Sequence, residues 1–307
     1  MLSFANVSFT YRGDWLQRIK ALSKVDLAVP AGASFGYLGA NGAGKSTSIK
    51  LVVGILQGHR GEIRLFDQPL GPVALRRRIG YLPEQPFFYD NLAVGEYLAY
   101  LGRLSGLAGA KLTAAAERVY QLLDLGALRE RKLRSFSKGM RQRFGLAQAI
   151  LHQPELLILD EPFSGLDPLW RARFKEVLAL ERRRGATVFF STHILSDVED
   201  LCDHYAVIDH GVVLEQGRLQ ALLGTAPLVM YGSGALPAGA QAQPDGSWSL
   251  EFPEDERETR LQALPAGAQL LRLERHRIAL EDYFVARVQA FHAAGKHLAP
   301  GPGGGGT

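Results

Sequence analysis

The feature that most constrains the fold is a glycine-rich loop between an apolar run and a helix-forming segment. Residues 34–38 are the apolar run, Gly39-Ala-Asn-Gly-Ala-Gly44 is the loop, and residues 46–56 are expected to be helical. Glycines let consecutive backbone N–H groups curl around a phosphate, and the positive end of the next helix points at the same place. Strand, loop and helix in this order predict a phosphate-binding loop. The residues expected to hold a nucleotide are Gly39, Asn41, Gly42, Ala43, Gly44, Lys45, Ser46 and Thr47.

A pair of carboxylates follows a second apolar run. Leu156-Leu-Ile-Leu159 reads as a buried strand, and it delivers Asp160 and Glu161 to its carboxyl end, where α/β folds place ligand chemistry. Mg²⁺ prefers oxygen ligands, so Asp160 is expected to hold the ion together with Ser46. Glu161 is then free to accept a proton from an attacking water. The sequence therefore predicts a P-loop nucleoside triphosphatase that uses ATP and Mg²⁺, a class that contains kinases, GTPases, helicases and transport motors.

Composition limits the choice of partners. The 307 residues are 47% apolar, enough for a sizeable core, and 35 basic against 31 acidic residues leave a net charge of only +4. This balance does not imply nucleic acid, and the arginine runs 76–78 and 182–184 are interpreted as solvated helix faces rather than as phosphate or lipid-headgroup patches. The single cysteine, Cys202, excludes an intramolecular disulfide. We expect a soluble chain in the cytoplasm, since no signal peptide or membrane-length apolar stretch is visible.

The order of the segments predicts an α/β core with a small appendage. Alternating strands open the chain and an antiparallel β-sheet is expected there, while residues 94–151 have helical periodicity and are expected to be an inserted helical subdomain. A change to Gly, Ala and Pro near residue 224 suggests a boundary. We expect an ATPase domain at 1–224, a small α+β accessory domain at 225–295 and a flexible tail at 296–307.

Further motifs narrow the class. The stretch 135–143, Ser-Phe-Ser-Lys-Gly-Met-Arg-Gln-Arg, resembles the signature sequence of ATP-binding cassette (ABC) proteins and lies upstream of Asp160, as in that family. Residues 164–167 resemble the family's D-loop, and 191–193 resemble its switch-histidine loop. The resemblance covers about residues 2–223. It implies nucleotide contacts from Tyr11, Ser137, Lys138, Gly139, Met140 and Asp167, and a catalytic role for His193 beside Glu161. For Tyr11, a core-facing side chain is the alternative to adenine stacking.

Departures from the family pattern point to one of its branches. Glu84 stands at the usual glutamine position, where its carboxylate still offers an oxygen near Mg²⁺, and Lys138 replaces the usual signature glycine. Together with the Leu280-Glu-Asp-Tyr-Phe284 stretch, they resemble two-component exporters whose membrane subunit is a separate chain. The resemblance implies a homodimer with shared ATP sites and an integral membrane permease as partner, at the cytoplasmic side of the cell membrane. The alternatives are a soluble ABC ATPase without a transport role and an importer ATPase.

The segment 84–101 is predicted to dock on the membrane partner. It is rich in aromatic residues and directly follows the loop expected near Mg²⁺. We expect Phe87 and Phe88 at the interface, whereas Tyr97 and Tyr100 have helical spacing and are assigned equally to the interface or to the helical core.

Overall fold

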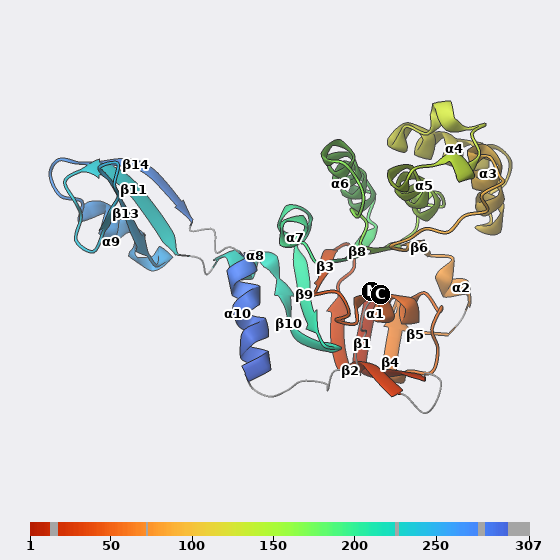
Figure 1. Cartoon of the computed structure of the whole chain (residues 1–307), viewed down its shortest axis with the longest axis horizontal. Coiled ribbons are helices and arrows are strands. Elements are labelled where there is room, and N and C mark those ends of the chain that lie inside the picture. The colour runs from red at the N-terminus through yellow and green to blue at the C-terminus, as the bar shows by residue number, and fades with distance from the viewer. Residues whose placement is uncertain (13–17, 72, 225–226, 276–279, 294–307) are drawn as a thin grey trace, which may run out of the picture. The chain divides into compact units, whose positions relative to one another are not determined.

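The structure is a computed structural model that describes residues 1–12, 18–71, 73–224, 227–275 and 280–293 (Figure 1). Contacts between Cα atoms divide the chain into a first unit, residues 1–216 with 291–307, and a second unit, residues 217–290. The boundary expected at residue 224 stays a prediction, and the tail expected at 296–307 lies outside the described residues.

An antiparallel sheet opens the first unit. Its strands are β1 (Leu2–Arg12), β2 (Arg18–Val29), β4 (Arg60–Leu65) and β5 (Gln68–Pro69), in the order β2-β1-β4-β5. Apolar side chains alternate along these strands, so one face is buried. This face packs with helix α1 (Lys45–Val52) in a core that includes Leu2, Phe4, Val7, Leu27, Ile49 and Val52.

A second sheet carries the loops of the predicted site. Its order is β10 (Val212–Arg218), β9 (His204–Asp209), β3 (Ser34–Leu38), β8 (Thr187–Thr192), β7 (Leu156–Asp160) and β6 (Ile79–Leu82). The strands from β9 to β6 are paired in parallel, and β3, β7 and β8 are buried along their whole length. Their carboxyl ends therefore meet at one edge, and the register places Asp160 opposite Ser191 and Leu38 opposite Thr192.

Helices inserted between β6 and β7 form the predicted subdomain. These are α3 (Val94–Leu104), α4 (Gly109–Leu123) and α5 (Lys138–Ile150), with short 3₁₀ turns at Gly126–Leu128 and Leu133–Ser135. Their buried side chains share a core with β7 and with α6 (Pro168–Arg183), centred on Phe144, Leu146 and Phe174. Two short helices, α2 (Val73–Arg76) and α7 (Leu195–Leu201), also belong to the first unit.

The second unit contains a separate small sheet with its own core. Strands β11 (Leu228–Gly234), β12 (Gln241–Ala242), β13 (Ser247–Phe252) and β14 (Ala268–Arg275) pair in the antiparallel order β12-β13-β11-β14. Trp248 lies at the centre of its core, packed with Leu228, Met230, Leu250 and Phe252. A 3₁₀ turn (Glu254–Glu256) and helix α9 (Arg257–Gln262) separate β13 from β14, and helices α8 (Leu219–Gly224) and α10 (Leu280–Ala293) flank the sheet in sequence. The predicted fold class, α/β with a small α+β appendage, is confirmed.

Two local predictions were wrong. Helix α1 ends at Val52 rather than at residue 56, because Gly54 adopts a left-handed φ of 81° and turns the chain. Phe88, expected at an interface, is only 2% exposed and packs edge-to-face on Phe144 in the helical core. Its neighbour Phe87 is 88% exposed, so the two adjacent rings lie in opposite environments. Tyr97 is buried in the same core as Phe88, whereas Tyr100 is exposed.

Candidate functional site

The glycine-rich loop connects β3 to α1 at the edge where the parallel strands end. Gly42 and Gly44 have left-handed φ angles of 82° and 108°, which glycine adopts without steric cost. At Gly39, a Cβ atom would lie 2.3 Å from the carbonyl oxygen of Ile208, so any other residue would push the loop away from β9. The glycines therefore fix the path of the loop over the sheet.

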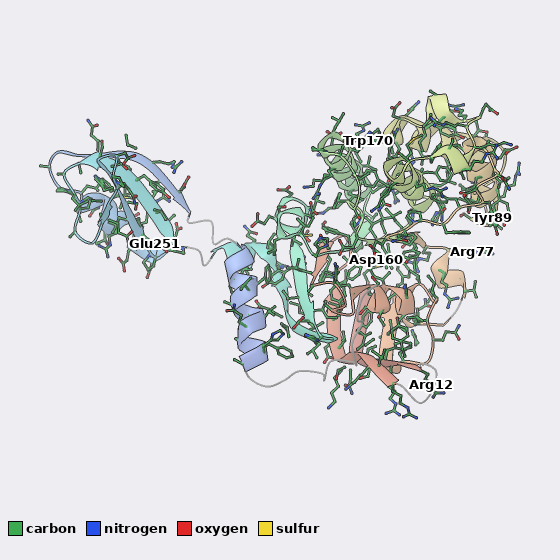
Figure 2. All side chains as sticks on the ribbon, in the orientation of Figure 1. Arg12, Arg77, Tyr89, Asp160, Trp170 and Glu251 are labelled. Carbon is green, nitrogen blue, oxygen red and sulfur yellow. The ribbon has the colours of Figure 1, made fainter. Side chains whose placement is uncertain are left out.

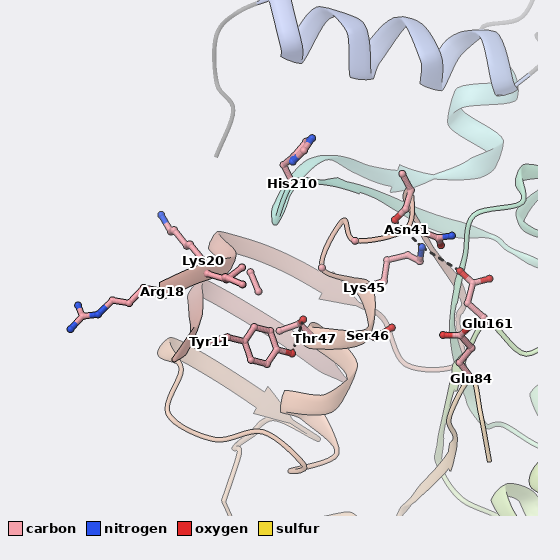
Figure 3. A pocket seen from close by; sticks show the side chains of 15 residues that line it. Tyr11, Arg18, Lys20, Asn41, Lys45, Ser46, Thr47, Glu84, Glu161 and His210 are labelled. Atoms are coloured by element: carbon pink, nitrogen blue, oxygen red, sulfur yellow. Dashed lines mark hydrogen bonds and ion pairs between the residues drawn. The ribbon is translucent and has the colours of Figure 1, made fainter. Parts of the chain in front are cut away.

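Lys45, the first residue of α1, is buried and its ammonium group is enclosed by the loop. Its Nζ atom donates to the carbonyl oxygens of Gly39 at 2.6 Å and Ala40 at 3.2 Å. It also lies 3.3 Å from Oε1 of Glu161, and both side chains are about nine-tenths buried (Figure 3). The loop, α1 and the end of β7 thus converge on one buried cation.

Asp160 is held at the end of β7 by two hydroxyl groups. Ser191 donates to its Oδ1 atom at 2.6 Å from the neighbouring strand β8, and Ser46 donates to the same atom at 3.2 Å from α1. Asp160 lies inside the first unit (Figure 2). The burial of Tyr81 on β6 and the negative charge of Asp160 together raise the pKa of the Tyr81 hydroxyl.

Ser46 and Asp160 fit a magnesium ion. Both present hard oxygen atoms, and the 3.2 Å between Ser46 Oγ and Asp160 Oδ1 is close to the separation of about 2.9 Å between adjacent ligands in an octahedron with Mg–O bonds of about 2.0–2.1 Å. Glu84, which follows β6, also lines the cavity described below. These three residues are the predicted metal ligands, and their roles stay a prediction.

Glu161 is held on both of its carboxylate oxygens. Oε1 faces Lys45, and Oε2 accepts a hydrogen bond from Nδ1 of His193 at 2.9 Å. Its backbone N–H donates to the Ser191 hydroxyl at 3.1 Å, and its φ angle is 47°, a left-handed conformation that is strained for a side-chain-bearing residue. The strand end thus fixes the direction of this carboxylate. His193 follows β8 and its side chain is half exposed, so it contacts both Glu161 and solvent.

A cavity of about 780 Å³ opens beside these groups, a size suited to a nucleotide. Residues 40–42 and 44–47 of the loop line it, together with Tyr11, Glu84 and Glu161. The Tyr11 hydroxyl is 3.1 Å from that of Thr47, and its ring packs edge-to-face on Phe9, so this side chain both lines the cavity and contacts the core. Gly39 and Ala43, also predicted to bind nucleotide, do not line the cavity and instead pack toward the sheet.

Sequence reasoning missed several residues that line the cavity. Arg18 and Lys20 at the start of β2 and His210 after β9 contribute side chains to its wall (Figure 3). Arg18 and Lys20 lie on β2 and His210 lies in the turn after β9, so the three residues form no local motif. Ser191 was noted only as part of the histidine loop, although its hydroxyl joins Asp160 to Glu161. A polar residue at the end of an otherwise apolar strand was the one available signal.

The signature residues lie apart from this cavity. Ser137 caps α5 and accepts a hydrogen bond from the N–H of Met140 at 3.3 Å. Lys138 extends over Gly165 and its Nζ atom donates to the Ser164 hydroxyl at 3.4 Å. Asp167 caps α6 by accepting from the N–H of Trp170 at 2.9 Å. None of residues 137–140 or Asp167 is among the described residues that line the cavity.

Comparison with known proteins identifies the family. The family profile described as ABC transporter matches residues 22–164. An uncharacterised ABC transporter ATP-binding protein of Synechocystis sp. is 36% identical over 92% of this chain and 83% of its own length. The chain belongs to the family of ABC transporter ATP-binding proteins. Its relatives include the daunorubicin/doxorubicin resistance ATP-binding protein DrrA of Streptomyces peucetius, 39% identical over 67% of this chain and 64% of DrrA.

Solved structures agree with the ABC assignment. A structure of the ATP-binding subunit of an ABC transporter superposes with a TM-score of 0.66 and 32% identity, over 72% of this chain and 91% of the other. The ATP-binding cassette MJ0796, determined as a dimer with ADP and phosphate, shares the fold with a TM-score of 0.65 and 22% identity over 71% of this chain and 99% of its own. The ABC ATPase fold predicted from the sequence is thus confirmed. Within the described residues, no helix combines the length and apolar character that crossing a bilayer requires.

Proposed function

We propose that this ABC protein is the ATP-hydrolysing subunit of a two-component membrane transporter of the exporter or flippase type. The proposal that this chain hydrolyses ATP rests on the position of Glu161. Its carboxylate follows a buried strand, beside the phosphate loop, and is oriented from both sides by Lys45 and His193. A carboxylate fixed in this way next to a nucleotide cavity is suited to take a proton from water.

The residues of the cavity divide the chemistry among them. Lys45 and the amides of the loop attract the phosphates, and the ammonium group can exchange its contacts with Gly39 and Ala40 for phosphate oxygens. Glu161 accepts the proton of the attacking water. His193, hydrogen-bonded to Glu161, holds the carboxylate in place and offers its second ring nitrogen toward the terminal phosphate. Tyr11 is the aromatic surface available to the adenine ring.

Magnesium would be bound by Ser46 and Asp160, with Glu84 at the edge of the same site. When bound, the ion neutralises charge that develops on the phosphate oxygens. The hydrogen bond from Ser191 keeps one lone pair of Asp160 occupied and fixes the orientation of the carboxylate. Glu84 carries a negative charge where the family usually has a neutral amide, so this residue raises the local preference for a cation.

The position of the signature supports a shared ATP site. Ser137, Lys138, Gly139 and Met140 form the start of α5, where the first-turn backbone N–H groups and the helix dipole favour an anion. They do not line this chain's own cavity. In the proposed homodimer, each signature instead contacts the ATP held by the phosphate loop of the other subunit. ATP binding would close the dimer, and hydrolysis would open it.

Transport is supported by the relatives and by an exposed aromatic surface. DrrA is named for daunorubicin/doxorubicin resistance, and a 37% identical relative from Bacillus licheniformis, over 64% of both chains, is the bacitracin transport ATP-binding protein BcrA. In this chain, three aromatic side chains that follow Glu84 in the sequence are exposed. Phe87 is 88% exposed, Tyr89 is 60% exposed, and Tyr100 on α3 is 43% exposed. Tyr89 lies at the outer edge of the helical subdomain (Figure 2). We assign this aromatic surface, Phe87, Tyr89 and Tyr100, to the contact with the separate membrane subunit at the cytoplasmic face of the membrane.

Replacing Phe87 with serine tests the docking assignment. An exposed aromatic anchor at the centre of an interface contributes about 2–4 kcal/mol, so Phe87→Ser should weaken binding of the membrane subunit by about 30-fold or more. Copurification of the two proteins measures this loss. Because Phe87 is 88% exposed, its replacement should leave melting temperature and ATP binding unchanged.

Two control variants separate a loss of docking from a general effect of removing an apolar side chain. Leu236→Ser removes another exposed apolar side chain, 52% exposed, in the second unit and should leave copurification intact. Phe88→Ser opens the helical core and is expected to lower the melting temperature. Unchanged copurification of the Phe87→Ser protein would show that this surface does not bind the membrane subunit.

A further inference from the structure

A cluster of two imidazoles and one carboxylate lies beside the nucleotide cavity and shares one residue, His210, with its wall. Nε2 of His292 is 2.7 Å from Oδ2 of Asp209, and Nε2 of His210 is 4.0 Å from the same oxygen. One ligand atom from each of the three residues lies within 4.8 Å of the others. All three residues belong to the first unit. His210 is one of the side chains that line the cavity.

These distances are close to those of a metal site. In a tetrahedral zinc site with bonds of about 2.0–2.1 Å, two ligand atoms are separated by about 3.4 Å. The observed 2.7 Å and 4.0 Å lie on either side of that value, and the third pair of ligand atoms is within 4.8 Å, so shifts of at most about 1.4 Å would bring the donors to coordination distance. Rotation of the exposed imidazole rings can supply such shifts.

The backbone supports each ligand differently. Asp209 is the last residue of β9 and is 7% exposed, so the sheet fixes its carboxylate. His210 and Gly211 form the two-residue turn from β9 to β10, with φ angles of 43° and 73°. Such turns favour asparagine before glycine, because both residues have positive φ. Histidine also adopts positive φ more readily than most residues, so this turn can hold the His210 imidazole beside Asp209.

We propose that Asp209, His210 and His292 bind a divalent transition-metal ion of the zinc type. Two imidazoles and a carboxylate match the ligands that zinc prefers, whereas Mg²⁺ and Ca²⁺ prefer oxygen ligands alone. The side chains of His210 and His292 are 45% and 39% exposed, so an ion can reach them from solvent, and a fourth position stays available for water. The ion joins the last turn of α10, which contains His292, to the turn beside the ATP cavity.

The test is a titration of the full chain with Zn²⁺ against a chromophoric zinc chelator. The parent should bind one ion per chain at this site, and His292→Ala and His210→Asn should each weaken its affinity by at least about tenfold. His210→Asn is the sharper variant, because asparagine suits the turn and should preserve the melting temperature measured without metal. His59→Ala removes a histidine outside the cluster and should bind zinc like the parent.

Each result bears on the proposal. A rise in melting temperature with Zn²⁺ in the parent, reduced in both cluster variants, supports the site, since an ion that binds only the folded chain stabilises it. Zinc binding that persists in both variants overturns the proposal. Zinc binding that disappears only in Asp160→Asn would place the ion at the magnesium ligands and would also overturn it. Absence of zinc binding by the parent would mean that the cluster is a hydrogen-bonded group without a metal.

Discussion

Replacing Glu161 with glutamine is expected to lower ATP turnover by about 10²–10⁴-fold while leaving ATP binding intact. Glutamine keeps the shape of the side chain but cannot accept the proton of the attacking water, and loss of a general base has an effect of this size. The phosphate contacts of Lys45 and the loop amides remain in this variant. Steady-state hydrolysis and nucleotide-binding titrations would measure the two quantities separately.

The same strand provides a control for Glu161. Glu155 precedes the first residue of β7, at the other end of the strand, and forms an exposed ion pair with Arg78. Glu155→Gln should therefore change stability by no more than about 1 kcal/mol and should leave turnover unchanged. Hydrolysis by Glu161→Gln within a few-fold of the parent would remove Glu161 from the role of base.

Glu161→Gln also tests the shared ATP site. If each ATP binds between a phosphate loop and the partner's signature, the variant should accumulate as an ATP-bound dimer, because the step that opens the dimer is blocked. Light scattering should then show a monomer without nucleotide and a dimer with ATP. Full-rate hydrolysis by a parent chain that stays monomeric with ATP would contradict the shared site.

Replacing Lys45 with alanine is expected to weaken ATP binding by at least about 30-fold. Lys45 is the buried cation of the phosphate loop, and truncating one partner of a buried charge pair costs about 2–5 kcal/mol. Fluorescent-nucleotide titration measures the affinity. The melting temperature should fall as well, because Glu161 is about nine-tenths buried and loses its cation.

Lys50→Ala controls for the loss of a lysine from α1. Lys50 lies in the last turn of the same helix and is not among the residues that line the cavity, so its replacement should leave ATP affinity unchanged. Equal affinities of the Lys45→Ala protein and the parent would show that the loop binds phosphate through its amides alone.

Local motifs made much of the site predictable. Residues 39–47 contain the strand end, the glycines and the helix start within one segment, so their spacing in sequence fixes their spacing in space. Asp160 and Glu161 were predictable for a similar reason, since four apolar residues precede them and place them at a strand end.

The site residues that the sequence did not predict are brought together by contacts between distant segments of the chain. Ser191 reaches Asp160 only because β8 lies next to β7 in the sheet, and that order is set by packing across the whole sheet. One cavity is lined by Arg18, Lys20 and His210, although almost 200 residues separate Arg18 from His210 in the sequence. Phe87 and Phe88 have the same chemistry and adjacent positions, so only the path of the loop separates the exposed ring from the buried one.

The contact between Lys138 and the loop after Glu161 has a consequence for cooperativity. Lys138 donates to Ser164, and its methylene groups lie so close to Gly165 that a Cβ there would meet them at 2.7 Å. In the proposed dimer, Glu161 serves this chain's own ATP while the start of α5 serves the ATP of the partner. A shift of the loop in one site should therefore displace the signature that completes the other. The two ATP sites of a dimer should then bind nucleotide as a coupled pair, with a Hill coefficient for ATP binding that differs from unity.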